Sequence, residues 1–191
     1  MISKVKFLGK ILVIIVGGYL IGHFIVTDHI QKTDGLRMVN DKGIKEEAPS
    51  ITLKSLSGKL VSLSDFKGKW IFLNFWATWC APCVVEMPMM NNLYNKLKDK
   101  NFIMLGISLD KENPYKVAKF AKNLKLDFPI LLDPKLETAT KYGVTTIPLT
   151  FMIGPDGRLE AIAEGIRNWD SKEMIQYFNS LINEEFSKTV N

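Results

Sequence analysis

The chain has 191 residues, of which 47% are hydrophobic and 24% charged, with a formal net charge of +5 and two cysteines. These fractions are near the averages of globular domains, which argues against wholesale disorder, a collagen-like repeat and a membrane protein with several spans. The length suits one domain with an appendage, and two cysteines are too few for a disulfide-dense scaffold.

The first 26 residues have the pattern of a signal anchor. Lys4, Lys6 and Lys10 precede an apolar run over residues 11–26. With its flanking residues the run reaches about 20 residues, roughly the thickness of a bilayer core. No pair of small residues suited to cleavage follows it. We therefore expect an N-terminal transmembrane helix over 1–26, with the rest of the chain outside the cytoplasm; a cleaved signal peptide and a buried core helix are the alternatives.

Residues 27–47 are rich in Lys, Asp, Glu and Gly, and their few apolar residues have no regular period. This composition predicts a flexible tether between the anchor and a domain over 48–191. Without the three leader lysines, 22 basic residues face 20 acidic ones. The exported part is therefore close to neutral, and nothing in it favours binding to nucleic acid.

Beyond residue 48, short apolar runs alternate with amphipathic segments, which is typical of an α/β domain. We expect a mixed β-sheet with helices on both faces. Pro88 falls inside one predicted helix and should kink it rather than end it. The expected strands are 51–53, 60–63, 70–76, 102–109, 128–132, 149–153 and 159–163, and the expected helices are 80–98, 114–124, 136–142 and one that starts at Trp169-Asp170.

Both cysteines lie in the segment Trp-Cys-Ala-Pro-Cys at 79–83, where the strand 70–76 gives way to a helix. A zinc site would need further ligands, but the only histidines, His23 and His29, precede the domain. Copper delivery would lack a third ligand for the same reason. Covalent haem would need a histidine at Val84, and a purely structural disulfide would close too small a loop to stabilise the fold much. Reversible redox chemistry is the favoured interpretation.

The position of the pair suits this chemistry. Cys80 would lie at a helix N-terminus, where unpaired N–H groups and the helix dipole stabilise the attacking thiolate. Cys83 would lie one turn later, placed to attack a mixed disulfide formed on Cys80 and release the reduced substrate.

Three segments resemble a known family: Asn-Phe-Trp-Ala-Thr-Trp-Cys-Ala-Pro-Cys at 74–83, Glu-Met-Pro at 86–88 and Tyr-Gly-Val-Thr-Thr-Ile-Pro-Leu-Thr-Phe at 142–151. With them the chain resembles the thioredoxin superfamily, in its branch of TlpA/ResA-like membrane-anchored thiol-disulfide oxidoreductases. The resemblance covers about residues 48–186 and implies a thioredoxin-like fold. Residues 110–141 are similar to the insertion that distinguishes this branch from thioredoxin.

The resemblance also implies a substrate-binding surface. Pro148 matches the family's cis proline, which would turn the backbone of Ile147 toward Cys80 so that an extended substrate strand can pair with it. An ordinary trans proline at the start of an edge strand is the alternative. Trp79, Ala81 and Pro82 around the cysteines are expected to contact the substrate as well.

The position below the cysteines departs from thioredoxin, because Asn74 stands where thioredoxin has a buried aspartate. Asparagine cannot take up a proton, so Cys83 needs another route to deprotonation. Glu86 lies one helical turn after Cys83 among apolar neighbours, which would raise its pKa and let it accept a proton near neutral pH. We take Glu86 as the hypothetical base; a solvated surface glutamate is the alternative.

The direction of electron flow follows from the residues between the cysteines. Ala81-Pro82 carries no cation to stabilise a thiolate, so the disulfide is relatively favoured and the protein should act as a reductant. Its expected partners are client protein disulfides and a membrane electron donor, and the resemblance implies apocytochrome c as a client. We expect no metal and no other cofactor, and a single-pass location in the cytoplasmic membrane with the domain on the periplasmic side. A disulfide oxidase or isomerase, and a tethered binding module or chaperone without turnover, are the rival functions.

Overall fold

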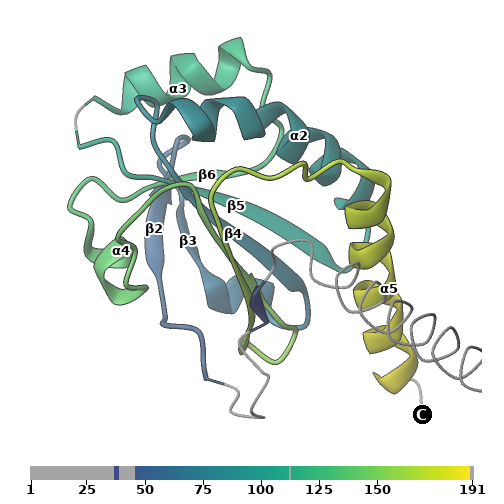
Figure 1. Cartoon of the computed structure of the whole chain (residues 1–191). Helices are drawn as coiled ribbons and strands as arrows, with labels where there is room; N and C mark the ends of the chain where they lie inside the picture. Colours follow the sequence, from purple (N-terminus) through teal and green to yellow (C-terminus); the bar gives the residue numbers. More distant parts are fainter. Residues whose placement is uncertain (1–36, 39–45, 112, 190–191) are drawn as a thin grey trace, which may run out of the picture. The chain divides into compact units, whose positions relative to one another are not determined.

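The computed structural model describes residues 37–38, 46–111 and 113–189 (Figure 1). Their strands form one mixed sheet in the order β1-β8-β7-β4-β5-β6-β2-β3. The strands are β1 (Arg37–Met38), β2 (Thr52–Ser55), β3 (Leu60–Ser62), β4 (Trp70–Trp76), β5 (Phe102–Ser108), β6 (Ile130–Leu132), β7 (Leu149–Ile153) and β8 (Leu159–Glu164). The helices are the 3-10 turn η1 (Leu63–Phe66), α2 (Ala81–Leu97), α3 (Pro114–Asn123), α4 (Glu137–Lys141) and α5 (Lys172–Thr189).

Strand β4 is the centre of the sheet. All seven of its residues are buried, as expected for a bulky apolar strand covered on both faces. It pairs in parallel with β5 and antiparallel with β7, and α2 provides the crossover from β4 to β5 that a parallel pair requires. The carboxyl ends of β4 and β5 therefore meet at the same edge of the sheet as the N-terminus of α2.

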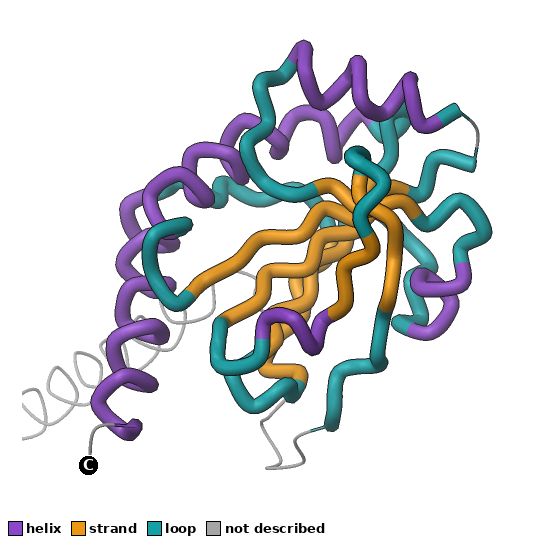
Figure 2. Tube along the Cα trace, turned by 180° about the vertical axis from the view of Figure 1, so that it is seen from behind, coloured by secondary structure: helices purple, strands orange, loops and turns teal. Residues whose placement is uncertain are grey.

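Side chains of β4 alternate between the two faces of the sheet. Phe72 contacts Phe178 of α5, and Trp76 contacts Phe120 of α3, at ring-centroid distances of 6.0 and 5.4 Å. Phe75 points the other way and contacts Tyr142, next to α4, at 5.5 Å. Figure 1 shows the resulting layers, with α2, α3 and α5 on one side of the sheet and α4 on the other, and Figure 2 shows the strands between them from behind.

The mixed sheet with helices on both faces is confirmed, and so is the helix that continues through Pro88. Three predicted boundaries differ from the structure by two residues or more. The strand expected over 51–53 ends at Ser55. The strand expected from 128 begins at Ile130, because Pro129 has no N–H to donate to the sheet. The last helix begins at Lys172, where the hydroxyl of Ser171 accepts a hydrogen bond from the Met174 N–H and so caps the first turn.

The expected anchor at 1–26 lies outside the described residues, as does most of the expected tether. Two tether residues, Arg37 and Met38, are strand β1 and pair with β8, and Glu47 forms an isolated bridge to Arg158. Arg37 and Met38 therefore contribute to the sheet by covering the edge of β8. Among the helices of the described ranges, none is long and apolar enough to cross a bilayer.

Candidate active site

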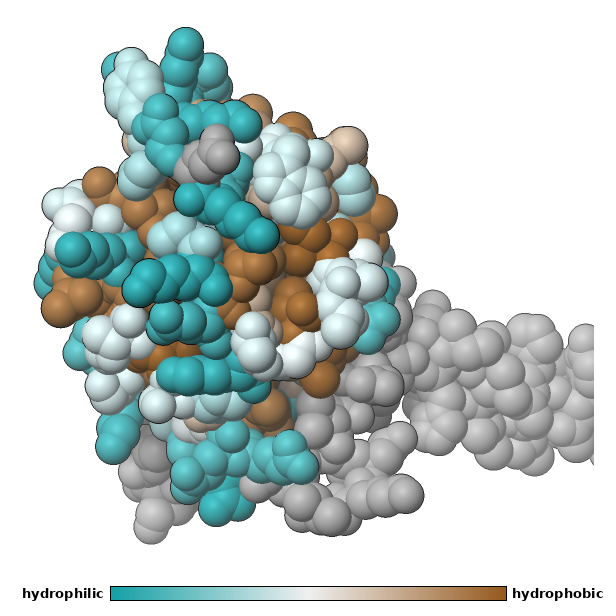
Figure 3. All heavy atoms as spheres, turned by 90° about the vertical axis from the view of Figure 1, so that its left-hand side faces the viewer, coloured by the Kyte–Doolittle hydropathy of each residue, from teal (hydrophilic) through white to brown (hydrophobic). Residues whose placement is uncertain are grey.

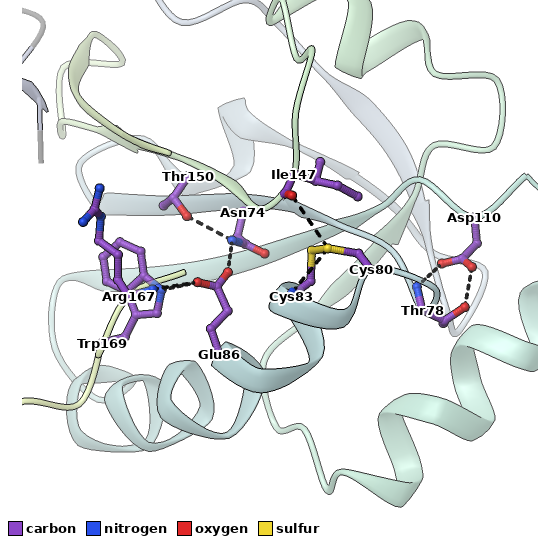
Figure 4. Close-up of a disulfide and its surroundings, with 10 residues drawn as sticks. All are labelled: Asn74, Thr78, Cys80, Cys83, Glu86, Asp110, Ile147, Thr150, Arg167 and Trp169. Atoms are coloured by element: carbon purple, nitrogen blue, oxygen red, sulfur yellow. Dashed lines mark hydrogen bonds between the residues drawn. A yellow bond between two sulfur atoms is a disulfide. The ribbon is translucent and has the colours of Figure 1, made fainter. Parts of the chain in front are cut away.

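The two cysteines form a disulfide where β4 leads into α2 (Figure 4). Cys80 is the N-cap of α2, and its Sγ lies 3.3 Å from the backbone nitrogen of Cys83, whose N–H points at it. Cys80 is 5% exposed and Cys83 is fully buried. Cys80 is therefore the sulfur that a substrate can reach, and it lies where helix N–H groups stabilise a thiolate.

The loop before Cys80 is held by Asp110, which follows β5. One carboxylate oxygen of Asp110 accepts hydrogen bonds from the Thr78 N–H and the Ser108 hydroxyl, both at 2.9 Å, and the other accepts from the Thr78 hydroxyl at 2.6 Å. Asp110 was not among the residues predicted for the site. Its position in the sequence could have indicated it. An acidic residue just after a strand parallel to β4 lies at the same edge of the sheet as the cysteines.

The segment that faces the disulfide is 147–148. The Ile147–Pro148 peptide bond is cis, as expected, and Pro148 is buried. The carbonyl oxygen of Ile147 lies 3.8 Å from Cys80 Sγ, within reach of a hydrogen bond from the reduced thiol. The structure thus brings Ile147 and Pro148 next to Cys80, although they are far from it in the sequence.

Trp79, Ala81 and Pro82 are exposed around the disulfide, with Trp79 at 67%. Trp79 borders two hollows. One, of about 160 Å³, is mainly apolar and includes Leu109, Val144 and Ile147 in its lining. The other, of about 400 Å³, is lined by Trp79, Leu109, Asp110, Lys111, Asn113 and Lys116. The face of the molecule on the side of α4 carries an apolar area bordered by polar residues (Figure 3).

Glu86 lies on the buried face of α2 and is fully inaccessible. Its Oε1 accepts a hydrogen bond from Asn74 Nδ2 at 3.0 Å. Its Oε2 accepts from the Trp169 indole N–H at 3.0 Å and from the Arg167 backbone N–H at 3.4 Å. The surface alternative for Glu86 is therefore wrong.

Burial raises the pKa of Glu86 from 4.5 to about 7, and the hydrogen bonds from Trp169, Asn74 and Arg167 oppose that rise. A carboxyl group with this pKa changes charge near neutral pH, as a proton acceptor for a buried thiol must. The residues that tune it, Trp169 and Arg167, were missed by the sequence analysis, because they are more than 80 positions away in the chain.

Asn74 lies in β4 between Glu86 and the cysteines (Figure 4). It is fully buried, and its amide nitrogen donates to Glu86 Oε1 and to Thr150 Oγ1 at 3.0 and 2.9 Å. Its amide oxygen has no hydrogen-bond partner among the described residues. In the same part of the chain, no group of three or more His, Cys, Asp and Glu side chains is placed to hold a metal ion.

This geometry agrees with what comparisons with known proteins show. The AhpC/TSA family model matches residues 44–162. The thiol-disulfide oxidoreductase ResA of Bacillus cereus is 33% identical over 176 residues, which are 92% of this chain and 96% of that protein. ResA of Bacillus thuringiensis is 40% identical over 135 residues, which are 71% of this chain and 76% of that protein.

Solved structures are also similar to this chain in fold and in sequence. A crystal structure assigned to a thiol:disulfide interchange protein DsbE from Chlorobium tepidum has a TM-score of 0.66 and 32% identity, covering 72% of this chain and 96% of that one. StoA from Bacillus subtilis has a TM-score of 0.59 and 28% identity, covering 68% and 97%. The chain therefore belongs to the AhpC/TSA family of thioredoxin-like proteins and, within it, to the ResA-like thiol-disulfide oxidoreductases, with Cys80 and Cys83 as its redox-active pair.

Proposed function

We propose that this oxidoreductase works as a reductant of disulfide bonds in client proteins, outside the cytoplasm and tethered to the membrane. The observation that supports this direction of electron flow is the environment of Cys83. This sulfur is fully buried, and a buried carboxyl group, Glu86, lies one helical turn after it. No cation stands between the cysteines, since residues 81–82 are Ala-Pro. A thiolate on Cys83 is therefore poorly stabilised, which favours the disulfide and lowers the reduction potential.

The first chemical step belongs to Cys80. Its thiolate attacks one sulfur of the client disulfide, forming a mixed disulfide with Cys80 while the other client sulfur leaves as a thiolate and takes up a proton. An extended client segment next to the Ile147 backbone would bring its sulfur to Cys80, because Ile147 O lies 3.8 Å from Cys80 Sγ. Exposed Trp79, Ala81 and Pro82 would contact the same segment.

The second step belongs to Cys83. It loses its proton and attacks Cys80 Sγ, which forms the Cys80–Cys83 disulfide and releases the client sulfur as a thiolate. Glu86 is the proposed proton acceptor, since its pKa of about 7 lets it be ionised near neutral pH and take up the proton. The client gains two electrons overall, and the disulfide left behind must be reduced by a dithiol donor before the next cycle.

The proposed location rests on the leader. Residues 1–26 join three lysines to an apolar run of membrane-spanning length, and a membrane donor could then reach the oxidised domain. Among clients, apocytochrome c is our first proposal, because the family branch implies it. Extraction of membranes checks the location: we expect release by detergent, and release by high salt alone would contradict the anchor.

The function is tested by trapping. Without Cys83 the mixed disulfide cannot resolve, so the full chain with Cys83→Ser should keep its client covalently attached to Cys80. A matched Cys80→Ser, Cys83→Ser variant should capture nothing. Capture of cytochrome precursors would support the first client, whereas full cellular function of the double variant would favour a binding module without turnover.

The direction is tested separately by the reduction potential. We expect a value nearer to that of thioredoxin, about −270 mV, than to that of the oxidant DsbA, about −120 mV. A value at the oxidising end would replace the proposed reductase by an oxidase or isomerase.

A further inference from the structure

The amide oxygen of Asn74 is a buried acceptor whose role in the disulfide form is unexplained. Asn74 is fully inaccessible, and Oδ1 has no partner among the described residues. Buried polar atoms in native proteins are nearly always hydrogen-bonded, so each exception calls for an explanation. An acceptor that lacks a donor in one redox state can gain one in the other.

The orientation of the amide follows from its neighbours. Asn74 Nδ2 has two hydrogens, and they are used by Glu86 Oε1 at 3.0 Å and Thr150 Oγ1 at 2.9 Å. An ionised Glu86 can only accept hydrogen bonds, so the nitrogen and not the oxygen must face it. The oxygen is thereby directed away from Glu86, and Figure 4 shows it pointing toward Cys83.

Within the described residues, no donor bonds to the oxygen in the disulfide form. In the sheet, Asn74 lies between Gly106 of β5 and Thr150 of β7. Gly106 has no side chain, and the Thr150 hydroxyl is bonded to the amide nitrogen. The indole N–H of Trp76, next to Gly106, makes no hydrogen bond to any described residue. The oxygen points toward Cys83 (Figure 4), whose sulfur carries no hydrogen in the oxidised protein because it is bonded to Cys80.

Reduction of the disulfide gives the Cys83 sulfur a hydrogen. A dithiol donor passes two electrons and two protons to the Cys80–Cys83 disulfide: the S–S bond breaks, each cysteine becomes a thiol, and the donor becomes a disulfide. Cys83 then has an S–H group, which is a weak hydrogen-bond donor, in a site closed to water.

We propose that Asn74 is a positioning residue for Cys83, whose thiol in the reduced protein donates a hydrogen bond to Asn74 Oδ1 while Asn74 Nδ2 holds the Glu86 carboxylate. One amide then fixes both the thiol that must lose a proton and the carboxylate that would take it up. The inference rests on the proposed function only in that it concerns the dithiol form, and it holds for either direction of electron flow.

The test uses the infrared S–H stretching band, whose frequency falls when the thiol donates a hydrogen bond. The full chain contains two cysteines, so the Cys80→Ser variant has a single S–H band, from Cys83. We expect Cys80→Ser, Asn74→Leu to shift this band to higher frequency. The matched control is Cys80→Ser, Thr150→Val, which removes the other contact of the amide and should leave the band in place. An unshifted band in the Asn74→Leu background, or an equal shift in the control, would overturn the proposal.

If the Asn74→Leu variant does not fold, the wild-type chain offers a second test. In the wild-type chain, reduction should shift the NMR signal of the Asn74 side-chain carbonyl carbon, whereas that of Asn95, which bonds Asp127 on the surface, should stay. An Asn74 signal equal in both redox states would contradict the inference. Neither readout involves a client, so failure of the proposed reductase function would leave both results intact.

Discussion

Glu86 of α2 and Trp169 of the segment before α5 are joined by a buried hydrogen bond of 3.0 Å, from the indole N–H to Oε2. The Trp169 ring also packs against Phe72 of β4, with ring centroids 4.7 Å apart. The carboxyl group of Glu86 is thus enclosed by the sheet on one side and by the segment before α5 on the other. We therefore expect its charge state to change the stability of the fold and, in the proposed mechanism, the chemistry of Cys83.

Stability should depend on pH through Glu86. The pKa of about 7 in the folded protein lies above the ordinary 4.5, so the folded state binds the proton more tightly than the unfolded state. The free energy of unfolding should therefore fall as pH rises from about 4.5 to about 7, by about 3 kcal/mol, and level off above that. Urea unfolding of the oxidised protein at pH 5 and pH 8 measures this fall.

Glu86→Gln should remove that fall, since glutamine does not titrate. Glu137, an exposed glutamate, provides the matched control, and Glu137→Gln should keep the wild-type difference between the two pH values. If Glu86→Gln unfolds with the same pH dependence as the wild type, the carboxyl group titrates like an ordinary glutamate.

The same substitution should slow the release of clients. Cys83 would lose its proton acceptor, and a positioned acid or base is worth about 100-fold or more in rate. We expect the mixed disulfide on Cys80 to accumulate during turnover and the inflection near pH 7 in the rate to disappear. Alkylation of Cys80 in the reduced protein, which reports the first step alone, should change little; an unchanged pH profile of client release would remove Glu86 from the mechanism.

Much of this site could be predicted from the sequence because its main parts are local. The bulky strand at 70–76, the cysteine pair and the following helix are consecutive, so their order alone places Cys80 at a helix N-terminus. Helical period then places Glu86 on the face of Cys83. Pro148 is remote, and only the family resemblance pointed to it.

The other residues of the site could not be predicted from a local pattern, because their contacts join segments that are far apart in the sequence. Trp169 and Arg167 reach Glu86 only because the segment before α5 packs against α2, and Thr150 reaches Asn74 only through the register of β4 and β7. Asp110 required the knowledge that β5 runs parallel to β4. The sequence could therefore predict that Glu86 has a raised pKa but not which donors limit the rise.

Asp110→Ala should destabilise the loop that carries Trp79 and Cys80. It leaves the N–H and hydroxyl of Thr78 without their acceptor, which costs about 1–3 kcal/mol in the free energy of unfolding. The alkylation rate of Cys80 should change as well, because Thr78 is two residues before it. Asp99, exposed after the end of α2, gives the control: Asp99→Ala should stay within about 0.5 kcal/mol of wild type. Equal losses in both variants would show that Asp110 has no special role.

Gly106→Ala tests the packing beneath the site. A Cβ at Gly106 would lie 3.0 Å from the Phe128 ring and 3.1 Å from Trp76 Nε1, and both aromatic residues are buried. The neighbours must move, so we expect a loss of about 1–3 kcal/mol in urea unfolding. Phe128→Leu in the same background should restore part of that loss. A Gly106→Ala protein as stable as wild type would show that the Phe128 and Trp76 rings can move to accommodate the methyl group at no cost in stability.

Trp79 should matter for clients and not for folding. Its side chain is 67% exposed and borders both hollows next to the disulfide, so a client segment can cover it while the folded core does not need it. Trp79→Ala should leave the free energy of unfolding within about 0.5 kcal/mol of wild type.

The expected effect of Trp79→Ala is on the KM for a protein client, which should rise about tenfold, equivalent to about 1.4 kcal/mol of lost binding. Reduction of a small aromatic disulfide should be nearly unchanged, because such a substrate needs Cys80 and little of the surrounding surface. Leu60→Ala is the control, since Leu60 is 59% exposed in β3, at the edge of the sheet, and should affect neither substrate. If Trp79→Ala slows both substrates equally, Trp79 supports the geometry of Cys80 instead of binding the client.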